Sequence, residues 1–396
     1  MARIVDLRSD TVTKPTKAMR HAMVNSALGD DVYGEDPTVN ALEKKIAGLL
    51  GKQAALFVPS GTMSNLIAIM VHCNKRGAEA FVGNKAHIYK YEQGGAAAIG
   101  GVLLSTLENN PDGTFDLQDL EDRIRGSDLH SPISSLVCVE TTHNVCGGKA
   151  SSQIMLDQTM HHRYNYLLFL QALPLKFLDD LSVVCKRHSL AIHVDGARLF
   201  NASEYLQQPA SRLVRDCDSV SVCFSKGLSA PVGSALVGSY HFIEQARRVR
   251  KALGGGMRQA GVLAAAAIVA LDEVVPLLGL DHKRAQVLAK AIQALSLKSF
   301  QVDPTVQHTN IVLVKIPQDC SITSEQVLQR LAQVSLEETQ GNCKTDNDEG
   351  VIVKAVEFDA RTVRFTLHRE IADEDLWLAI MKITYVFKEL DAAALL

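Results

Sequence analysis

The chain has 396 residues, of which 47% are hydrophobic and 21% are charged, and its formal net charge is −3. This length exceeds a typical single domain of about 100 to 200 residues, so we expect two domains. The small net charge offers no basic surface to nucleic acid or acidic lipid, so we expect neither as a partner. The composition is that of an ordinary soluble enzyme, which makes a small-molecule ligand the expectation.

The cysteines and the amino terminus favour a cytoplasmic protein. Eight cysteines are scattered through mostly apolar stretches without paired metal-ligand spacing, which is typical of reduced core residues and predicts no metal site. The opening sequence MARIVDLRSDTVTKPT contains Asp6 and Asp10 and has no apolar core, so we expect neither an export signal nor a transit peptide. The longest apolar stretch, GVLAAAAIVAL at 261–271, is too short to cross a bilayer and predicts a buried helix.

Strand and helix patterns alternate through the first two-thirds of the chain. Helical spacing of apolar residues after Pro37 predicts the first helix, and the turn Ser60–Thr62 separates a strand from a helix that ends near Cys73. Short apolar runs predict strands at 54–58, 80–82, 134–140, 190–194, 219–224 and 235–238. This alternation indicates an α/β fold, with a three-layer large domain around a mostly parallel, doubly wound sheet.

The pattern changes after the glycines at 254–256. Long helices are predicted around 259–274 and 282–295, followed by shorter strands and a last helix at about 373–390. Those strands are predicted at 310–316, 350–353 and 362–367. We therefore expect a large domain at 1–256 and a smaller α+β domain at 257–396.

Asp195 and Lys226 each stand where a short apolar run ends and a glycine follows. Functional groups of open α/β sheets gather at the carboxyl ends of such strands. A lysine there can form a Schiff base with an aldehyde cofactor, and an aspartate can keep a pyridinium ring protonated as an electron sink. The pair predicts pyridoxal 5'-phosphate; the alternative is a helix-capping Asp195 and a solvated Lys226.

Three further segments supply candidate partners for this pair. Ser60-Gly61-Thr62 joins a strand to a helix and so suits a phosphate, although a serine there is also an ordinary N-cap. Arg198 follows Asp195 within one turn and suits a substrate carboxylate. Arg364, in TVRFTLH, could supply a second guanidinium; the alternative for each arginine is a surface ion pair.

Three histidines could stack on a pyridine ring or transfer protons near neutral pH. They are His87 in KAHIYKYEQGG, His130 in SDLHSPISS and His143 in ETTHNVCGG. The alternative is that all three are structural histidines.

Seven segments in order give the chain a family resemblance. They are LRSDTVTKPT, GDDVYGEDPTVNALE, PSGTMSNL, ETTHN, HVDGARLFNAS, CFSKGLSAPVGSALVGS and RKALGGGMRQAG. Over Asp6 to about Val274 closely, and more loosely beyond, the chain resembles the low-specificity L-threonine aldolases, which are pyridoxal phosphate enzymes of fold type I.

The resemblance implies a role for each matching position. Lys226 would be the Schiff-base lysine, Asp195 the partner of the pyridine nitrogen and His87 the residue stacked on the ring. Gly61 and Thr62 would hold the phosphate. The substrate carboxylate would be held by Ser9, Arg198 and Arg364, and His130 would lie near the substrate hydroxyl. Tyr33, Lys251 and Arg258 would reach a neighbouring subunit's cofactor, which implies a homotetramer of paired dimers.

The implied reaction is cleavage of a β-hydroxy amino acid, L-threonine or L-allo-threonine, to glycine and acetaldehyde. The base could be His87, His130 or a water that they hold. One alternative is another fold type I enzyme such as an aminotransferase, which would share Lys226 and Asp195. A second is a catalytically impaired form of this fold that acts as a partner-binding subunit.

Residues 151–172 depart from the resemblance. The sequence SSQIMLDQTMHHRYNYLLFLQA separates GGKA from LPLKF, where the family runs almost directly from one to the other. We interpret it as an insertion of the kind a retained splice segment produces; a partner-binding or membrane-touching element is the alternative. The adjacent His161 and His162 are too few ligands for a metal site.

Overall fold

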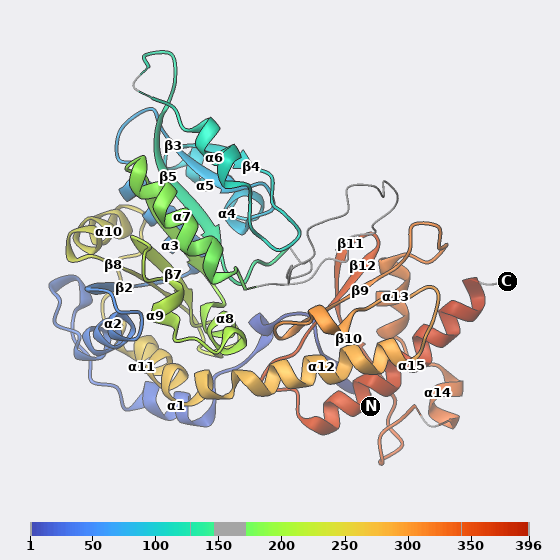
Figure 1. The fold of residues 1–396 in the computed structure, drawn as a ribbon. Helices are drawn as coiled ribbons and strands as arrows, with labels where there is room; N and C mark the ends of the chain where they lie inside the picture. Colours follow the sequence, from blue (N-terminus) through green and yellow to red (C-terminus); the bar gives the residue numbers. More distant parts are fainter. Residues whose placement is uncertain (1, 127, 146–171, 342, 395–396) are drawn as a thin grey trace. The chain divides into compact units, whose positions relative to one another are not determined.

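The computed structural model describes residues 2–126, 128–145, 172–341 and 343–394 (Figure 1). These residues form two compact units. The large unit comprises residues 14–145 and 172–276, and the small unit comprises residues 2–13 and 277–394. The predicted insertion at 151–172 lies almost entirely outside the described residues.

This division differs from the predicted boundary at 256/257 in two ways. Residues 2–13 belong to the small unit because strand β1 (Arg3–Asp6) pairs in parallel with β10 (Val351–Lys354). The large unit continues to residue 276 because α11 (Gly261–Val269) packs against α1 (Lys17–Val24) and α2 (Pro37–Leu49).

The large unit is built on a seven-stranded sheet with the order β2-β8-β7-β6-β5-β3-β4. Strand β8 runs antiparallel to its neighbours β2 and β7, and the other neighbouring pairs are parallel. The strands are β2 (Ala54–Val58), β3 (Ala78–Gly83), β4 (Leu103–Leu107), β5 (Ile133–Glu140), β6 (Ala191–Gly196), β7 (Ser219–Cys223) and β8 (Ser234–Gly238). The mostly parallel sheet predicted from the sequence is confirmed, although β4 was not predicted, because Ser105 and Thr106 interrupt its leucines.

Helices cover both faces of this sheet. Helix α3 (Gly61–His72) lies between β2 and β3 in the chain, and α7 (Leu175–Arg187) lies between β5 and β6. In the strand order, the first connection runs toward β4 and the second runs back toward β2. Because such connections are right-handed, the two helices lie on opposite faces, and α7 lies in front of the strands in Figure 1. The remaining helices of this unit are α4 (His87–Lys90), α5 (Gly95–Ala98), α6 (Leu117–Arg123), α8 (Leu199–Leu206), α9 (Ala210–Leu213), α10 (Tyr240–Ala252) and the short η2 (Asp31–Tyr33).

Helix α11 is a core helix, as predicted. Gly261 and the alanines 264–267 are buried, and small residues allow close packing on α1 and α2. By length and composition alone, the helical run Gly261–Ala294 could cross a membrane, but half of its most apolar window is buried within the protein. A π-helical turn at Ala270–Val274 and Pro276 interrupt this run.

The small unit is an α+β arrangement. A three-stranded antiparallel sheet has the order β11-β12-β9, and β1 and β10 form a separate parallel pair. Its elements are β9 (Ile311–Lys315), β11 (Val356–Asp359), β12 (Thr362–Thr366), α12 (Leu278–Ala294), α13 (Ser324–Leu331), α14 (Leu336–Gln340), α15 (Asp373–Ala394), η1 (Asp10–Val12) and η5 (Pro304–Val306). One apolar cluster that includes Leu288, Val312, Phe365 and Phe387 joins the helices to the strands.

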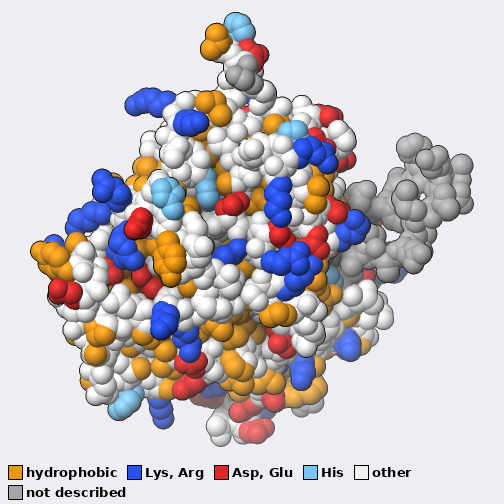
Figure 2. Space-filling model, turned by 60° about the vertical axis from the view of Figure 1, so that its left-hand side comes forward, with side chains coloured by type: hydrophobic (Ala, Val, Ile, Leu, Met, Phe, Trp, Pro, Cys, Tyr) orange, Lys and Arg blue, Asp and Glu red, His pale blue; other side chains and the backbone are white. Residues whose placement is uncertain are grey.

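Charged side chains of both signs are intermixed over the face presented in Figure 2, which agrees with the small net charge. Within the large unit, the parallel strands β3, β5, β6 and β7 share one carboxyl edge, where several predicted side chains gather.

Candidate active site

Asp195 lies near the carboxyl end of β6 and is only 3% exposed. Its Oδ1 accepts the N–H of Ala197 at 3.1 Å, and its Oδ2 accepts the side-chain amide of Asn65 at 2.9 Å. These two donors satisfy both carboxylate oxygens in a buried position and fix the orientation of the side chain at the edge of the sheet.

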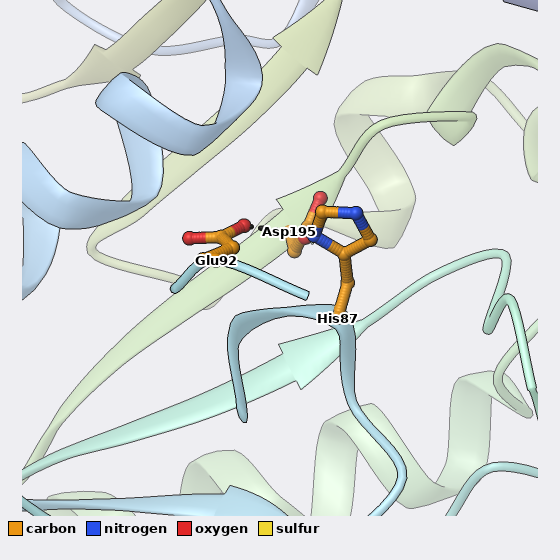
Figure 3. A group of neighbouring side chains, drawn as sticks. All are labelled: His87, Glu92 and Asp195. Carbon is orange, nitrogen blue, oxygen red and sulfur yellow. Dashed lines mark hydrogen bonds and ion pairs between the residues drawn. The ribbon is translucent and has the colours of Figure 1, made fainter. Parts of the chain in front are cut away.

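His87 begins α4 beside Asp195 and pairs with Glu92 (Figure 3). Its Nδ1 lies 2.9 Å from Glu92 Oε1, and its backbone N–H donates to Glu140 Oε2 at 2.7 Å. The hydrogen bond to Glu92 raises the pKa of His87, and the charge of Asp195 adds to this effect. Burial raises the pKa of Glu92, but Glu92 Oε1 also accepts from Asn65 at 2.8 Å, so we place the shared proton on His87 Nδ1.

Ligand atoms of His87, Glu92 and Asp195 all lie within 4.8 Å of one another, which is close enough to hold a cation. However, the Asn65 amide donates to both carboxylates. A bound cation would compete with these N–H donors for the same oxygens. The contacts therefore favour a hydrogen-bonded cluster over a metal centre.

Lys226 follows the end of β7, the strand next to β6, and is half-buried. The amino terminus of α3 approaches the same strand end, because a Cβ on Gly61 would lie 2.7 Å from Cys223 Sγ. Ser60 caps this helix by accepting from Met63 N–H at 3.2 Å, and Thr62 is exposed in its first turn. Gly61 thus allows the amino terminus of α3, which can bind an anion, to lie close to the segment that carries Lys226.

Arg198 directly precedes α8 and is buried, with 8% exposure. Its Nη1 lies 3.4 Å from Asn144 Oδ1, and the Asn144 N–H donates to Glu140 Oε1 at 2.7 Å. Glu140, at the end of β5, therefore accepts hydrogen bonds from the backbone N–H groups of both His87 and Asn144. Asn144 in turn contacts Arg198. The structure brings Arg198 to the carboxyl edge that also carries Asp195.

Ser9 and Arg364 belong to the small unit and lie near each other. Ser9 caps η1, and Arg364 on β12 donates from Nη2 to the carbonyl oxygen of Arg8 at 3.4 Å. Thr366 reinforces this contact, because its backbone N–H donates to Leu7 O at 2.8 Å. The paired prediction of Ser9 and Arg364 is therefore compatible with the small unit's geometry.

Two predicted histidines are placed differently from His87. His130 is exposed and precedes the amino end of β5, whereas Glu140 is at the carboxyl end, and an eight-residue strand spans about 25 Å. Within one chain, His130 therefore lies at the opposite end of β5 from Glu140, and its role near the substrate stays a prediction. His143 is 1% exposed, and burial lowers its pKa, which indicates a neutral core histidine.

Tyr33, Lys251 and Arg258 have exposed side chains on the large unit. Arg258 joins the segment before Tyr33, since its Nη1 lies 3.0 Å from Asp30 Oδ2 and its carbonyl oxygen accepts from Asp31 N–H. Gly256 packs against the Lys251 side chain. The three residues predicted to reach a neighbouring subunit are thus solvent-exposed in this chain, and their role stays a prediction.

Sequence reasoning missed Asn65, Glu92 and His193. Asn65 lies one turn beyond the Ser60–Thr62 turn on α3, and Glu92 follows His87 by five residues. His193 precedes Asp195 by two residues, so both side chains point to the same face of β6. The period-two pattern could have identified His193, but the pairing of Asn65 with Glu92 depends on the fold.

Comparison with known proteins identifies the family. The chain matches the family model described as beta-eliminating lyase over residues 6–165 and 171–318. It is 46% identical to low-specificity L-threonine aldolase 1 of Arabidopsis thaliana over 343 residues, which are 86% of this chain and 89% of that relative. The chain belongs to the low-specificity L-threonine aldolase family of beta-eliminating lyases. Its identity to the Escherichia coli K12 low specificity L-threonine aldolase is 41% over 316 residues, 80% of this chain and 86% of that one.

The fold agrees with this membership. The solved structure of Leishmania major threonine aldolase aligns with a TM-score of 0.70 at 19% identity, covering 98% of this chain and 99% of that one. The architecture is that of fold type I pyridoxal phosphate enzymes. For this aldolase-family chain, the predicted fold class, lyase class and cofactor, pyridoxal phosphate, are confirmed.

The donor set at the carboxyl edge of this aldolase-family chain fits that cofactor. The helix amino terminus at Gly61 matches the cofactor's phosphate, and Lys226, on the turn after β7, matches its aldehyde. The buried carboxylate of Asp195 and the neighbouring imidazole of His87 match its ring nitrogen and ring face. Gly61 gives the most direct test of this fit. A side chain at this position would meet Cys223 and move the amino terminus of α3, where the phosphate would bind, away from β7.

Proposed function

We propose that this chain cleaves L-threonine and L-allo-threonine to glycine and acetaldehyde in a pyridoxal phosphate-dependent retro-aldol reaction. The observation that supports it most strongly is the position of Asp195 and Lys226 at the ends of adjacent strands, with His87 beside Asp195, in a chain of this family. The bound cofactor supplies an aldehyde for the amino group and a ring that withdraws electrons from the breaking bond.

The cofactor is assigned to residues of the large unit. Gly61 and Thr62 would hold the phosphate at the amino terminus of α3, and Lys226 would supply the amine for the aldehyde. Asp195 would accept a hydrogen bond from the protonated ring nitrogen, because its carboxylate is buried and already held by Asn65 and Ala197. His87 would lie against the ring, and its contact with Glu92 fixes the orientation of the imidazole.

The substrate carboxylate is assigned to Ser9, Arg198 and Arg364. A carboxylate held by two guanidinium groups fixes the orientation of the amino acid, and orientation selects which bond at the α-carbon breaks. This assignment rests on the family resemblance at these positions.

Loss of acetaldehyde requires that a base remove the β-hydroxyl proton. Within one chain His87, or a water that it holds, is the candidate, because the pKa of its imidazole is tuned by Glu92. A contribution from His130 requires a second copy of the chain, since His130 lies at the opposite end of β5.

A shared active site and a homotetramer of paired dimers form part of this proposal. The exposed Tyr33, Lys251 and Arg258 support it. We also assign the protein to the cytoplasm, where the unpaired cysteines of the described chain would stay reduced, and to threonine breakdown with glycine formation.

The decisive experiment measures the products. The purified chain with added pyridoxal phosphate should convert each threonine epimer to equal amounts of acetaldehyde and glycine, without any keto acid. Formation of a keto acid without acetaldehyde would instead support an aminotransferase. Cofactor binding without either product would support a catalytically impaired, partner-binding form.

A further inference from the structure

A continuous line of polar side chains runs from Asp195 through the interior of the large unit. Asn65 Nδ2 lies 2.9 Å from Asp195 Oδ2, and Asn65 Oδ1 lies 3.1 Å from His193 Nε2. His193 Nδ1 lies 2.8 Å from Ser219 Oγ, which lies 2.8 Å from His72 Nε2. Asn65, His193 and Ser219 are at most 1% exposed, so water does not take part in these contacts.

The secondary structure explains why these residues meet. His193 and Asp195 point to the same face of β6, and His193 pairs in register with Ser219 on β7. Asn65 and His72 are seven residues apart on α3, which is two helical turns and therefore the same face. That helix covers this face of the sheet, so the line of contacts is a direct result of packing α3 on β6 and β7.

The direction of each hydrogen bond follows from Asn65. Its amide nitrogen has two hydrogens, and these point to Asp195 and Glu92, so its oxygen must accept from His193 Nε2. A flipped amide would place its oxygen against two carboxylates.

The rest of the line is then determined. Burial lowers the pKa of His193 to about 3, so the neutral ring carries its one proton on Nε2, and Nδ1 accepts from Ser219. The Ser219 hydroxyl has one hydrogen, so its oxygen accepts from His72 Nε2. Every donor in this order meets an acceptor, and the last N–H ends on Asp195.

We propose that His193 is a positioning residue for the cofactor: by donating from Nε2 it fixes the Asn65 amide in the orientation that donates to Asp195. Asn65 then keeps Asp195 a carboxylate with its charge directed to the pyridine nitrogen. This inference rests on the role of Asp195 in the proposed function and names the residues on which that role depends. The protonation of the bound cofactor's ring nitrogen would then depend on His193, which hydrogen-bonds to Asn65 and not to Asp195 itself.

The test uses a matched pair of substitutions at His193. An asparagine amide reaches roughly the position of Nδ1, so His193→Asn can contact Ser219 but cannot donate to Asn65. A glutamine amide reaches roughly the position of Nε2, so His193→Gln restores that donor. Each variant is loaded with pyridoxal phosphate labelled with ¹⁵N in the ring, and the pyridine nitrogen is followed by NMR as the pH is raised.

We expect the pyridine nitrogen in His193→Asn to lose its proton about one pH unit lower than in the wild type. The reason is that the Asn65 amide is no longer fixed in the orientation that donates a hydrogen bond to the Asp195 carboxylate. His193→Gln should titrate close to the wild type. Asp195→Asn is the reference, in which the nitrogen should lose its proton at a still lower pH. A His193→Asn midpoint equal to the wild type, beside a lowered Asp195→Asn midpoint, overturns the role of His193 and leaves the proposed function intact.

If Asp195→Asn does not move the midpoint, the assignment of Asp195 itself fails, and this inference fails with it. A variant that melts at a lower temperature with an unchanged midpoint shows a merely structural histidine and also overturns the proposal. If His193→Asn does not fold, Asn65→Leu removes the same donor to Asp195. Its midpoint should fall equally, and an unchanged midpoint would refute the proposed path through Asn65.

Discussion

Two carboxylates, Asp195 and Glu92, lie close together at the edge of the large unit's sheet, and like charges at this distance repel. The Asn65 amide separates them by donating to both, and His87 adds a proton on the Glu92 side. Each acid consequently has its own partner. At the scale of single residues, Glu92 is the hydrogen-bond partner that raises the pKa of His87, and Asn65 is the donor that orients Asp195.

Glu92→Gln should lower the pKa of His87. The Glu92 hydrogen bond is the largest contribution that raises this pKa, and an amide cannot supply the charge. Because His87 is neutral only above its pKa, the neutral imidazole should persist to lower pH in the variant, and an acid limb of the rate that depends on His87 should move to lower pH. An NMR titration of the His87 ring checks this directly.

Glu140→Gln is the matched control for that titration. Glu140 hydrogen-bonds to the backbone N–H of His87 and not to its ring, so the Glu140→Gln variant should shift the ring titration less. Equal shifts in the two variants would contradict the specific role assigned to Glu92.

Lys226→Ala should lower turnover by about a thousandfold or more, because the variant lacks the amine assigned to the cofactor aldehyde. The fold should persist, since Lys226 is half-buried on a turn after β7 and contributes no apolar core. Acetaldehyde release and circular dichroism measure the two effects. Lys176→Ala, which removes an exposed partner of Asp180, is the control and should retain activity; a Lys226→Ala variant at comparable activity would refute the assignment.

At the scale of secondary-structure elements, a buried ion pair connects α14 to α15 in the small unit. Glu338 Oε1 lies 2.5 Å from Lys382 Nζ, and both side chains are at most 1% exposed. Glu338 also caps its own helix, because its Oε2 accepts from Ser335 N–H. Arg330 Nη1 of α13 lies 3.0 Å from the same Glu338 oxygen, so a buried carboxylate on the short helix α14 pairs with cations from two other helices.

Glu338→Gln should lower the free energy of unfolding of the small unit by about 3 to 5 kcal/mol, because it leaves a buried ammonium group without its counter-charge. Urea unfolding followed by the fluorescence of Trp377, the chain's single tryptophan and a residue of α15, reports this unit. Asp180→Asn breaks the exposed pair with Lys176 and should cost less than about 1 kcal/mol. A loss no greater than that of the control would show that the pair is dispensable.

The predicted insertion can be tested from its described flank. Leu173 is fully buried, and its N–H donates to Thr141 Oγ1 at 3.2 Å, while Thr141 N–H donates to Asp195 O. Deleting residues 151–172 keeps Leu173, and with it this anchor next to Asp195. The deleted sequence is rich in apolar residues, so its removal should reduce exposed apolar surface. Closing the shorter connection costs little entropy. We therefore expect the deletion variant to have an equal or higher melting temperature and rate of acetaldehyde release. A deletion that melts lower and turns over more slowly would show the segment to be an integrated part of the protein.

At the scale of the whole molecule, the proposed shared site predicts complementation between inactive subunits. Lys226→Ala and Arg258→Ala should each be nearly inactive alone, since one lacks the amine and the other lacks the residue assigned to the neighbouring cofactor. In a mixed dimer, the chain with Lys226 receives Arg258 from its partner, which restores one site.

Refolding the two variants together at equal amounts should recover about a quarter of wild-type activity, because half of the dimers are mixed and each has one intact site. Acetaldehyde release before and after mixing is the measurement. Mixing without any gain would show that Arg258 serves its own chain. A mixture of Lys226→Ala with Asp195→Asn should also give no gain, because those two residues belong to the same subunit's site.

The sequence by itself determined the α/β class, the family and the central pair, because these depend on local signals. The end of a buried strand at Asp195, the glycine turn before α3 and helical spacing after Pro37 are all encoded within a few neighbouring residues. Only the tertiary structure decided that residues 2–13 join the small unit, that His130 lies at the far end of β5 and that Asn65 bridges two acids. The physical reason is that a buried polar group takes whichever partner the packing brings to it, and Asn65 finds Asp195 at a sequence separation of 130 residues. No local pattern encodes a contact that exists only after α3 has packed on the sheet.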